Sequence, residues 1–133
     1  MLSPSPGLPA TERTGYIQPH ALSELWFHTG TACNLACPFC LEGSRPGDDR
    51  LQRITLRDVQ PWLAEAVGLG VRQFSFTGGE PFIVRDMVNI LARAAALRPC
   101  LVLTNGTDAL LRRARQLERL RDAPQPVTFR ARI

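Results

Sequence analysis

The sequence predicts an α/β fold in which a parallel sheet forms part of a (β/α) barrel. Short apolar segments typical of strands begin near residues 25, 71, 100 and 127. Amphipathic segments typical of helices lie between them, and this alternation favours right-handed crossovers between parallel strands. The length of 133 residues, of which 44% are hydrophobic, suits a single domain with one core. We therefore expect about three βα units plus a fourth strand.

The first unit begins with a predicted strand at residues 25–29 (LWFHT), which runs directly into a cysteine segment at residues 33–40 (CNLACPFC). Residues 42–53 are polar and contain glycine and proline, so they predict an exposed connection. Thr55 followed by Asp58 resembles a capping box and predicts a helix that ends near Gly68 and Gly70. Because Pro61 would then lie inside the helix, Asp58 is the alternative N-cap.

The second and third units follow the same order of strand, short polar loop and helix. Apolar residues at helical spacing, from Met87 to Ala94, predict the second helix, which Pro99 ends. The third helix is expected at residues 108–122. The remaining predicted strands are residues 71–77 (VRQFSFT), 100–104 (CLVLT) and 127–133 (VTFRARI). The aromatic residues assigned to the core are Trp26, Trp62, Phe74 and Phe76, and Cys100 is expected to be a small buried hydrophobe.

Residues 1–20 predict a flexible N-terminal tail, because this segment is rich in proline and has no apolar stretch typical of a signal peptide. The sequence also contains no run of about 18 apolar residues that would predict a membrane helix. We therefore expect a cytoplasmic protein with no membrane partner. Cysteines stay reduced in that compartment, so clustered cysteines indicate metal ligands more than disulfides.

The net charge of +4 lies entirely in residues 101–133, which hold seven arginines and three acidic residues. Five of these arginines fall in the third predicted helix: Arg112, Arg113, Arg115, Arg119 and Arg121. A stretch of this kind can face nucleic acid. Leucines at helical spacing within it, and the absence of interleaved aromatic residues, favour the solvated face of an amphipathic helix instead. Nucleic acid is therefore not an expected partner.

Cys33, Cys37 and Cys40 have the spacing C-x3-C-x2-C. Three thiolates leave one iron of a four-iron cluster open to an external ligand. Two alternatives are a stripe of core cysteines on a helix and a structural zinc site. A zinc site would need a fourth ligand, for which His28 and Cys100 are the candidates.

Three short motifs follow the three predicted strands in order: CNLACPFC at residues 33–40, TGGEP at 77–81 and LTNGT at 103–107. In this order, residues 21–133 resemble the radical S-adenosylmethionine (radical SAM) superfamily, and in particular the group of the molybdenum-cofactor cyclase and the peptide-modifying maturases. The resemblance implies a tail at residues 1–20 and a partial radical SAM core domain at residues 21–133. It also implies a [4Fe-4S] cluster held by the three cysteines and a 5'-deoxyadenosyl radical generated from SAM.

The same resemblance assigns cofactor contacts to other residues. Gly78, Gly79, Glu80 and Pro81 would contact the methionine part of SAM, since glycines permit a close backbone approach and Glu80 can accept hydrogen bonds from an ammonium group. Phe39 matches the aromatic position beside the adenine, and Thr104 and Asn105 match a strand end near cofactor or substrate. The alternatives are a simple tight turn at the glycines, a Glu80 next to a helix N-cap and a Phe39 that is only packed. His28 is expected to be a hydrogen-bonded core or barrel-interior histidine, with a proton-transfer role as the alternative.

Family barrels usually have six βα units, so the resemblance implies a truncated barrel whose later strands do not contribute cofactor contacts. Where many relatives have a small hydroxyl residue and then an acidic one, this chain reads Arg130, Ala131, Arg132 and Ile133. A non-catalytic iron-sulfur or SAM-binding module and an inert remnant are therefore the alternatives to an enzyme. The expected partners are an external electron donor such as flavodoxin or ferredoxin, a substrate that the sequence does not identify, and a partner chain that completes the open sheet edge.

Overall fold

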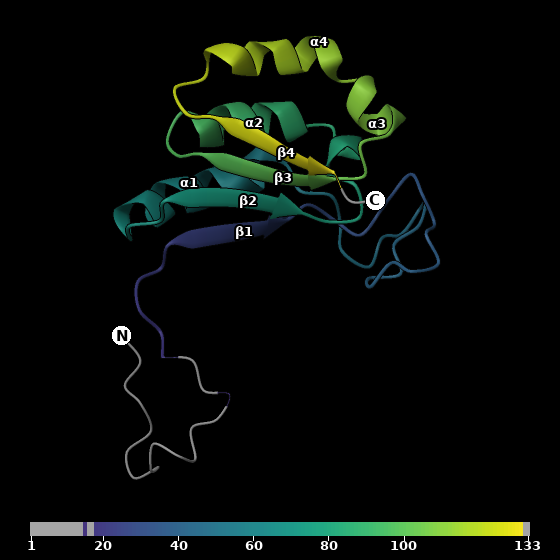
Figure 1. Ribbon diagram of the computed structural model, residues 1–133, viewed down its shortest axis with the longest axis horizontal. Coiled ribbons are helices and arrows are strands. Elements are labelled where there is room, and N and C mark those ends of the chain that lie inside the picture. Colours follow the sequence, from purple (N-terminus) through teal and green to yellow (C-terminus); the bar gives the residue numbers. More distant parts are fainter. Residues whose placement is uncertain (1–14, 16–17, 132–133) are drawn as a thin grey trace.

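Four parallel strands form one open sheet in chain order, β1-β2-β3-β4, in the computed structural model, which describes residue 15 and residues 18–131. In Figure 1 the four arrows point the same way, and the long loop after β1 lies at their carboxyl ends. The α/β fold with a parallel sheet is therefore confirmed. The strands are β1 (Glu24–His28), β2 (Gln73–Thr77), β3 (Cys100–Thr104) and β4 (Val127–Ala131).

Helices follow each of the first three strands and bury one face of the sheet. Alternate residues of β2 and β3 point to that face, so Phe74, Phe76 and Val102 are fully buried there. They pack against apolar residues of α1 and α2, which include Leu63 and Leu91. The helical segments are α1 (Leu56–Gly68), η2 (Pro81–Ile83), α2 (Met87–Ala95), α3 (Asp108–Leu111), α4 (Ala114–Leu117) and η3 (Glu118–Asp122).

The first helix starts at the predicted capping box. The Thr55 hydroxyl accepts a hydrogen bond from the N–H of Asp58, and the Asp58 carboxylate accepts one from the N–H of Thr55. The alternative start at Asp58 is therefore wrong, and Pro61 lies inside the helix. The carbonyl that Pro61 cannot pair with belongs to Arg57, which is exposed, so water can hydrate it.

The single helix predicted at residues 108–122 is wrong, because three short segments replace it. Arg113, at the break between α3 and α4, is half-buried, and its guanidinium donates to the carbonyls of Phe82, Val84 and Arg85 at 3.0–3.3 Å. Arg113 is thus not on a solvated face as predicted. Arg112 does fit that prediction, since it is exposed and pairs with Asp108 one turn earlier at 3.1 Å.

The predicted core is correct for residues inside the sheet and wrong for both tryptophans. Phe74, Phe76 and Cys100 are buried, as expected. Trp26 is 44% exposed and Trp62 is 56% exposed. Trp26 lies on β1 at the edge of the sheet, on the face opposite Phe27, and Trp62 lies on the outer side of α1. In residues 18–131, no helix covers either tryptophan side chain in the way that α1 and α2 cover Phe76.

Part of the tail predicted at residues 1–20 lies outside the described residues, as do Arg132 and Ile133 at the end of the last predicted strand. Within residues 18–131, no helix combines the length and the apolar character needed to cross a lipid bilayer.

Candidate functional site

The cysteine loop is held at the carboxyl end of β1 by a frame of hydrogen bonds. The N–H of Ile54 donates to the carbonyl of Thr29 at 3.1 Å, so the end of the loop is tied to the residue that follows β1. Thr31 ties the middle of the loop, because its hydroxyl donates to Asp48 at 2.8 Å and accepts from the N–H of Leu51 at 2.9 Å. The cysteines therefore follow a segment of fixed backbone.

The loop also packs directly on the two glycines after β2. The N–H of Gly79 donates to the carbonyl of Gly30 at 2.9 Å, and the N–H of Glu80 donates to that of Ala32 at 3.0 Å. A Cβ on Gly79 would overlap the Ala32 carbonyl oxygen, and one on Gly78 would overlap the hydroxyl of Thr29. The close backbone approach expected of these glycines is made, in this structure, by the cysteine loop itself.

Glu80 lies beneath the cavity and is 1% exposed. It is the N-cap of η2, since its carboxylate accepts from the N–H of Phe82 at 2.9 Å. The same carboxylate accepts from the hydroxyl of Thr104 at 2.8 Å and from the N–H of Asn105 at 2.7 Å. Glu80 thus joins the loops that follow β2 and β3, and it is the N-cap itself, not a residue next to an N-cap as in the alternative.

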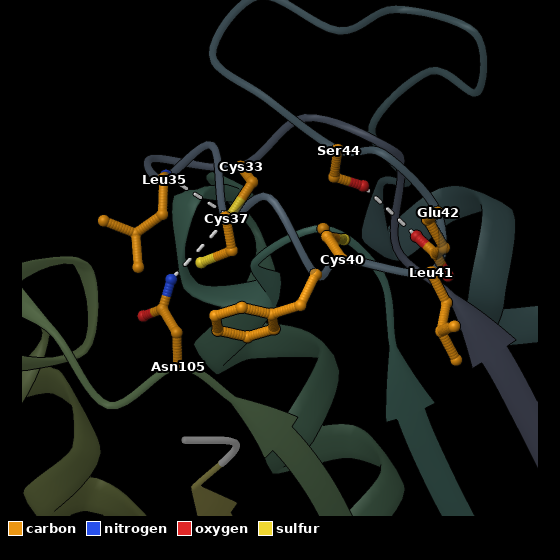
Figure 2. A pocket seen from close by; sticks show the side chains of 10 residues that line it. Cys33, Leu35, Cys37, Cys40, Leu41, Glu42, Ser44 and Asn105 are labelled. Atoms are coloured by element: carbon orange, nitrogen blue, oxygen red, sulfur yellow. Dashed lines mark hydrogen bonds between the residues drawn. The ribbon is translucent and has the colours of Figure 1, made fainter.

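A cavity of about 790 Å³ opens between the cysteine loop and the end of β3. Cys33, Cys37 and Cys40 all line it, and Figure 2 shows them on one loop opposite Asn105. All three are free thiols. A [4Fe-4S] cluster takes one thiolate per iron, so its ligands surround a volume and do not meet at a point. Three thiols around one cavity fit that requirement.

N–H groups point at two of the three sulfurs. The backbone N–H of Ser44, with those of Glu42 and Gly43, lowers the pKa of the Cys40 thiol below its usual value. The sulfur of Cys33 lies 3.4 Å from the N–H of Leu35 and 3.7 Å from Nδ2 of Asn105. Thiolates are the form that binds iron, so this environment also suits a cluster.

The alternatives for the cysteines fit less well. No helix runs through residues 33–40, so they do not form a helical core stripe. A zinc site needs four donors at one ion, and no three ligand side chains of residues 18–131 gather in that way. Cys100 is at the opposite end of β3, where burial raises its pKa to about 12. His28 bonds to Glu42 at 3.0 Å and accepts from the N–H of Gly30 at 3.2 Å, so it is hydrogen-bonded as expected but only half-buried.

The structure divides the predicted SAM contacts into two groups. Phe39, Gly79 and Asn105 line the cavity. Phe39 is 75% exposed, so the alternative that it is merely packed is wrong. The other four predicted residues do not line it: Gly78, Glu80, Pro81 and Thr104. Three of these are buried behind the cavity wall, at 2% exposure or less: Glu80, Pro81 and Thr104.

Sequence reasoning missed several residues that border or support the cavity. Leu35, Leu41, Glu42 and Ser44 line it. Asn34 was missed although it lies inside the cysteine motif, where a polar residue beside a candidate ligand is a signal for a supporting role. Its amide donates to Thr107 at 2.9 Å and to Asp108 at 3.0 Å, and so links the cysteine loop to the loop after β3.

A sequence model described as the Radical SAM superfamily matches residues 27–130, which include the sheet, the cysteine loop and the cavity. The chain belongs to the radical SAM superfamily. The resemblance inferred from the three motifs is therefore confirmed.

Radical SAM proteins named GTP 3',8-cyclase are among its relatives. The cyclase of Xanthomonas axonopodis pv. citri is 32% identical over 113 residues, which cover 74% of this chain and 34% of that protein. The cyclase of Mycolicibacterium smegmatis is 42% identical over 94 residues, which cover 65% of this chain and 25% of that protein. This chain thus spans about a quarter to a third of the length of these relatives.

Among solved structures, Streptococcus suis SuiB superposes with a TM-score of 0.63 at 23% identity. The match covers 90% of this chain and 26% of SuiB. At this identity the likeness supports the fold and does not extend to the reaction.

Proposed function

We propose that this chain binds a [4Fe-4S] cluster through Cys33, Cys37 and Cys40 and presents its open iron to SAM. When bound, the cluster supplies the electron that cleaves SAM reductively to methionine and a 5'-deoxyadenosyl radical, which abstracts hydrogen from a substrate. The observation that carries the proposal is the grouping of three free thiols around one cavity at the carboxyl ends of parallel strands. Membership of the radical SAM superfamily supports it.

The cavity walls suggest how SAM is held. Gly79 is the glycine of its motif that borders the cavity, so the methionine part of SAM is placed beside it in this proposal. Phe39 exposes most of its ring on the same cavity and offers an apolar face to adenine. Glu80 and Thr104 support this wall from behind, as their burial and mutual hydrogen bond indicate.

Anaerobic reconstitution with iron and sulfide tests the ligand set. We expect about four irons per chain and a [4Fe-4S] absorption spectrum. Replacement of any one of Cys33, Cys37 or Cys40 by alanine should remove the cluster. Cys100→Ala is the matched control and should retain it, because that thiol lies in the core at the other end of β3. Iron that persists in Cys37→Ala, or that depends on Cys100, would refute this ligand assignment.

A non-catalytic cluster-binding or SAM-binding module is the second candidate. It is favoured by the burial of Glu80 and Thr104, two predicted SAM contacts that do not line the cavity. Release of 5'-deoxyadenosine with a strong reductant separates the two functions. A chain extended by a complete relative's second half is the comparison: equal yields favour an active first half, whereas release from the extended chain alone favours the module.

In the cell, we propose that flavodoxin or ferredoxin supplies the electron.

A further inference from the structure

The side-chain amide of Asn105 has its full hydrogen-bonding capacity taken up by the protein. Its Nδ2 donates to Oδ1 of Asn34 at 2.8 Å and to the sulfur of Cys33 at 3.7 Å. Its Oδ1 accepts from the N–H of Thr107 at 3.2 Å and from its hydroxyl at 2.7 Å. An amide offers two N–H donors and two acceptor lone pairs. No donor of Asn105 is therefore left for a ligand in the cavity that it borders.

The neighbours of Asn105 fix which end of the amide faces Cys33. The backbone N–H of Thr107 can only donate, so the oxygen of Asn105 must face Thr107. Asn34 donates through Nδ2 to the carboxylate of Asp108, so its own oxygen must face Asn105. Both constraints place the N–H groups of Asn105 toward Asn34 and Cys33, as Figure 2 shows for the cysteine.

Glu80 fixes the backbone of Asn105. Its buried carboxylate accepts the Asn105 N–H at 2.7 Å and is itself held by the N–H of Phe82 at 2.9 Å. Hydrogen bonds to a carboxylate are roughly twice as strong as those between neutral groups. The end of β3 is thus tied to the loop after β2, and the amide of Asn105 is aimed at the cysteine loop from a fixed base.

We infer that Asn105 is a positioning residue, fixed by Glu80, whose amide N–H donates to the sulfur of Cys33 and raises the reduction potential of the cluster bound there. The inference rests on the proposed function, which makes Cys33 an iron ligand. Reduction adds negative charge to a cluster and its ligand sulfurs, and a hydrogen-bond donor at sulfur stabilises that charge. Glu80 and Asn105 then contribute to SAM cleavage indirectly, through the cluster ligand Cys33 and the wall of the cavity.

Two variants of the reconstituted chain test the donor. Asn105→Asp keeps an oxygen for Thr107 but loses both N–H groups, and Asn105→Leu loses them without adding charge. We expect both to retain the cluster and to lower its midpoint potential, followed by electron paramagnetic resonance during a redox titration. Asn89→Asp, on the exposed side of α2, adds the same charge and should leave the potential unchanged. A shift in Asn105→Asp alone would indicate charge without a hydrogen bond and would overturn the inference.

A second measurement uses the chain without iron and so separates this inference from the proposed function. In nuclear magnetic resonance spectra, the side-chain N–H groups of Asn105 should exchange with solvent at least tenfold more slowly than those of Asn89. Glu80→Gln should remove that protection, because its amide presents N–H groups where the carboxylate accepts. Equal exchange at Asn105 and Asn89 would overturn the inference even if the cluster forms. If Asn105 is protected from exchange but the chain takes up no iron, the proposed function is refuted. The claim that the Asn105 amide is fixed by its neighbours would still hold.

Discussion

The cavity has two walls of opposite character. The packed wall, residues 78–80 with 104–105, is buried at its centre: Glu80 is 1% exposed and Thr104 is 2% exposed. The open wall, residues 37–41, projects its apolar side chains outward: Phe39 is 75% exposed and Leu41 is fully exposed. The packed wall satisfies its polar groups within the protein, whereas the open wall offers surface to a ligand. A motif residue can therefore be needed to build the cavity wall without lining the cavity itself.

The largest effect is expected where the packed wall meets the cysteine loop. Gly79→Ala places a Cβ on the Ala32 carbonyl oxygen and 2.7 Å from that of Thr31, and both obstacles are backbone atoms. We expect a loss of about 3 kcal/mol or more in the free energy of unfolding, enough to unfold a small domain.

Urea unfolding followed by circular dichroism measures this loss, with Gly68→Ala as the matched control. Gly68 is at the end of α1 and has no atom within 4 Å of an added Cβ. The control should be neutral or stabilising by up to about 1 kcal/mol. Equal stability of the two variants would contradict the close packing of the glycines against the cysteine loop.

The sequence was sufficient to predict where the packed wall lies in the fold. It was not sufficient to predict which residues contact each other within that wall. The nearly continuous apolar run placed the strand at residues 100–104 correctly, because a strand buried by its neighbours must be apolar along its length. The motifs also located the three cysteines around one cavity. The partners of Glu80 were not predictable, since Thr104 and Asn105 are brought to it only by the pairing of β2 with β3. For the same reason, local helical spacing could not show that Arg113 leaves the helix to bind carbonyls far away in sequence.

Thiol reactivity should differ strongly between the open wall and the core. Burial raises the pKa of Cys100 to about 12, while backbone N–H groups led by that of Ser44 lower the pKa of Cys40 below its usual value. Since the thiolate is the nucleophile, iodoacetamide should modify Cys40 in the iron-free chain about a thousandfold faster at neutral pH.

As the pH is raised, the rate of Cys40 modification should reach a plateau once its thiol has ionised. The rate of Cys100 modification should continue to rise. Mass spectrometry of peptides from timed samples measures both rates, and the urea-unfolded chain is the control in which the difference should disappear. Comparable rates in the folded chain would mean that the core around β3 is open.

A smaller effect is expected from the arginine that supports the packed wall. Arg113 donates to carbonyls of residues 82–85, immediately after the GGEP motif, so Arg113→Ala removes a donor from the part-buried carbonyls of Phe82 and Val84. The Val84 carbonyl keeps the N–H of Met87 as a donor. We expect a loss of about 1–2 kcal/mol in the free energy of unfolding. Arg112→Ala removes only an exposed pair with Asp108 and should cost at most about 0.5 kcal/mol. If Arg112→Ala were the more harmful change, the surface helix predicted from the sequence would be the better description.

The smallest effect on stability is expected in the open wall, which makes it the sharpest test of the division between the walls. Phe39 is mostly exposed, so Phe39→Ala should change the free energy of unfolding by no more than about 0.5 kcal/mol. Phe76→Ala, the same change at a fully buried ring in β2, should cost about 3–5 kcal/mol. If the ring of Phe39 packs on adenine, its loss should weaken SAM binding to the reconstituted chain by up to about tenfold, measured by equilibrium dialysis. Unchanged affinity would remove Phe39 from the SAM site, and a large loss of stability would show that the open wall carries structure as well.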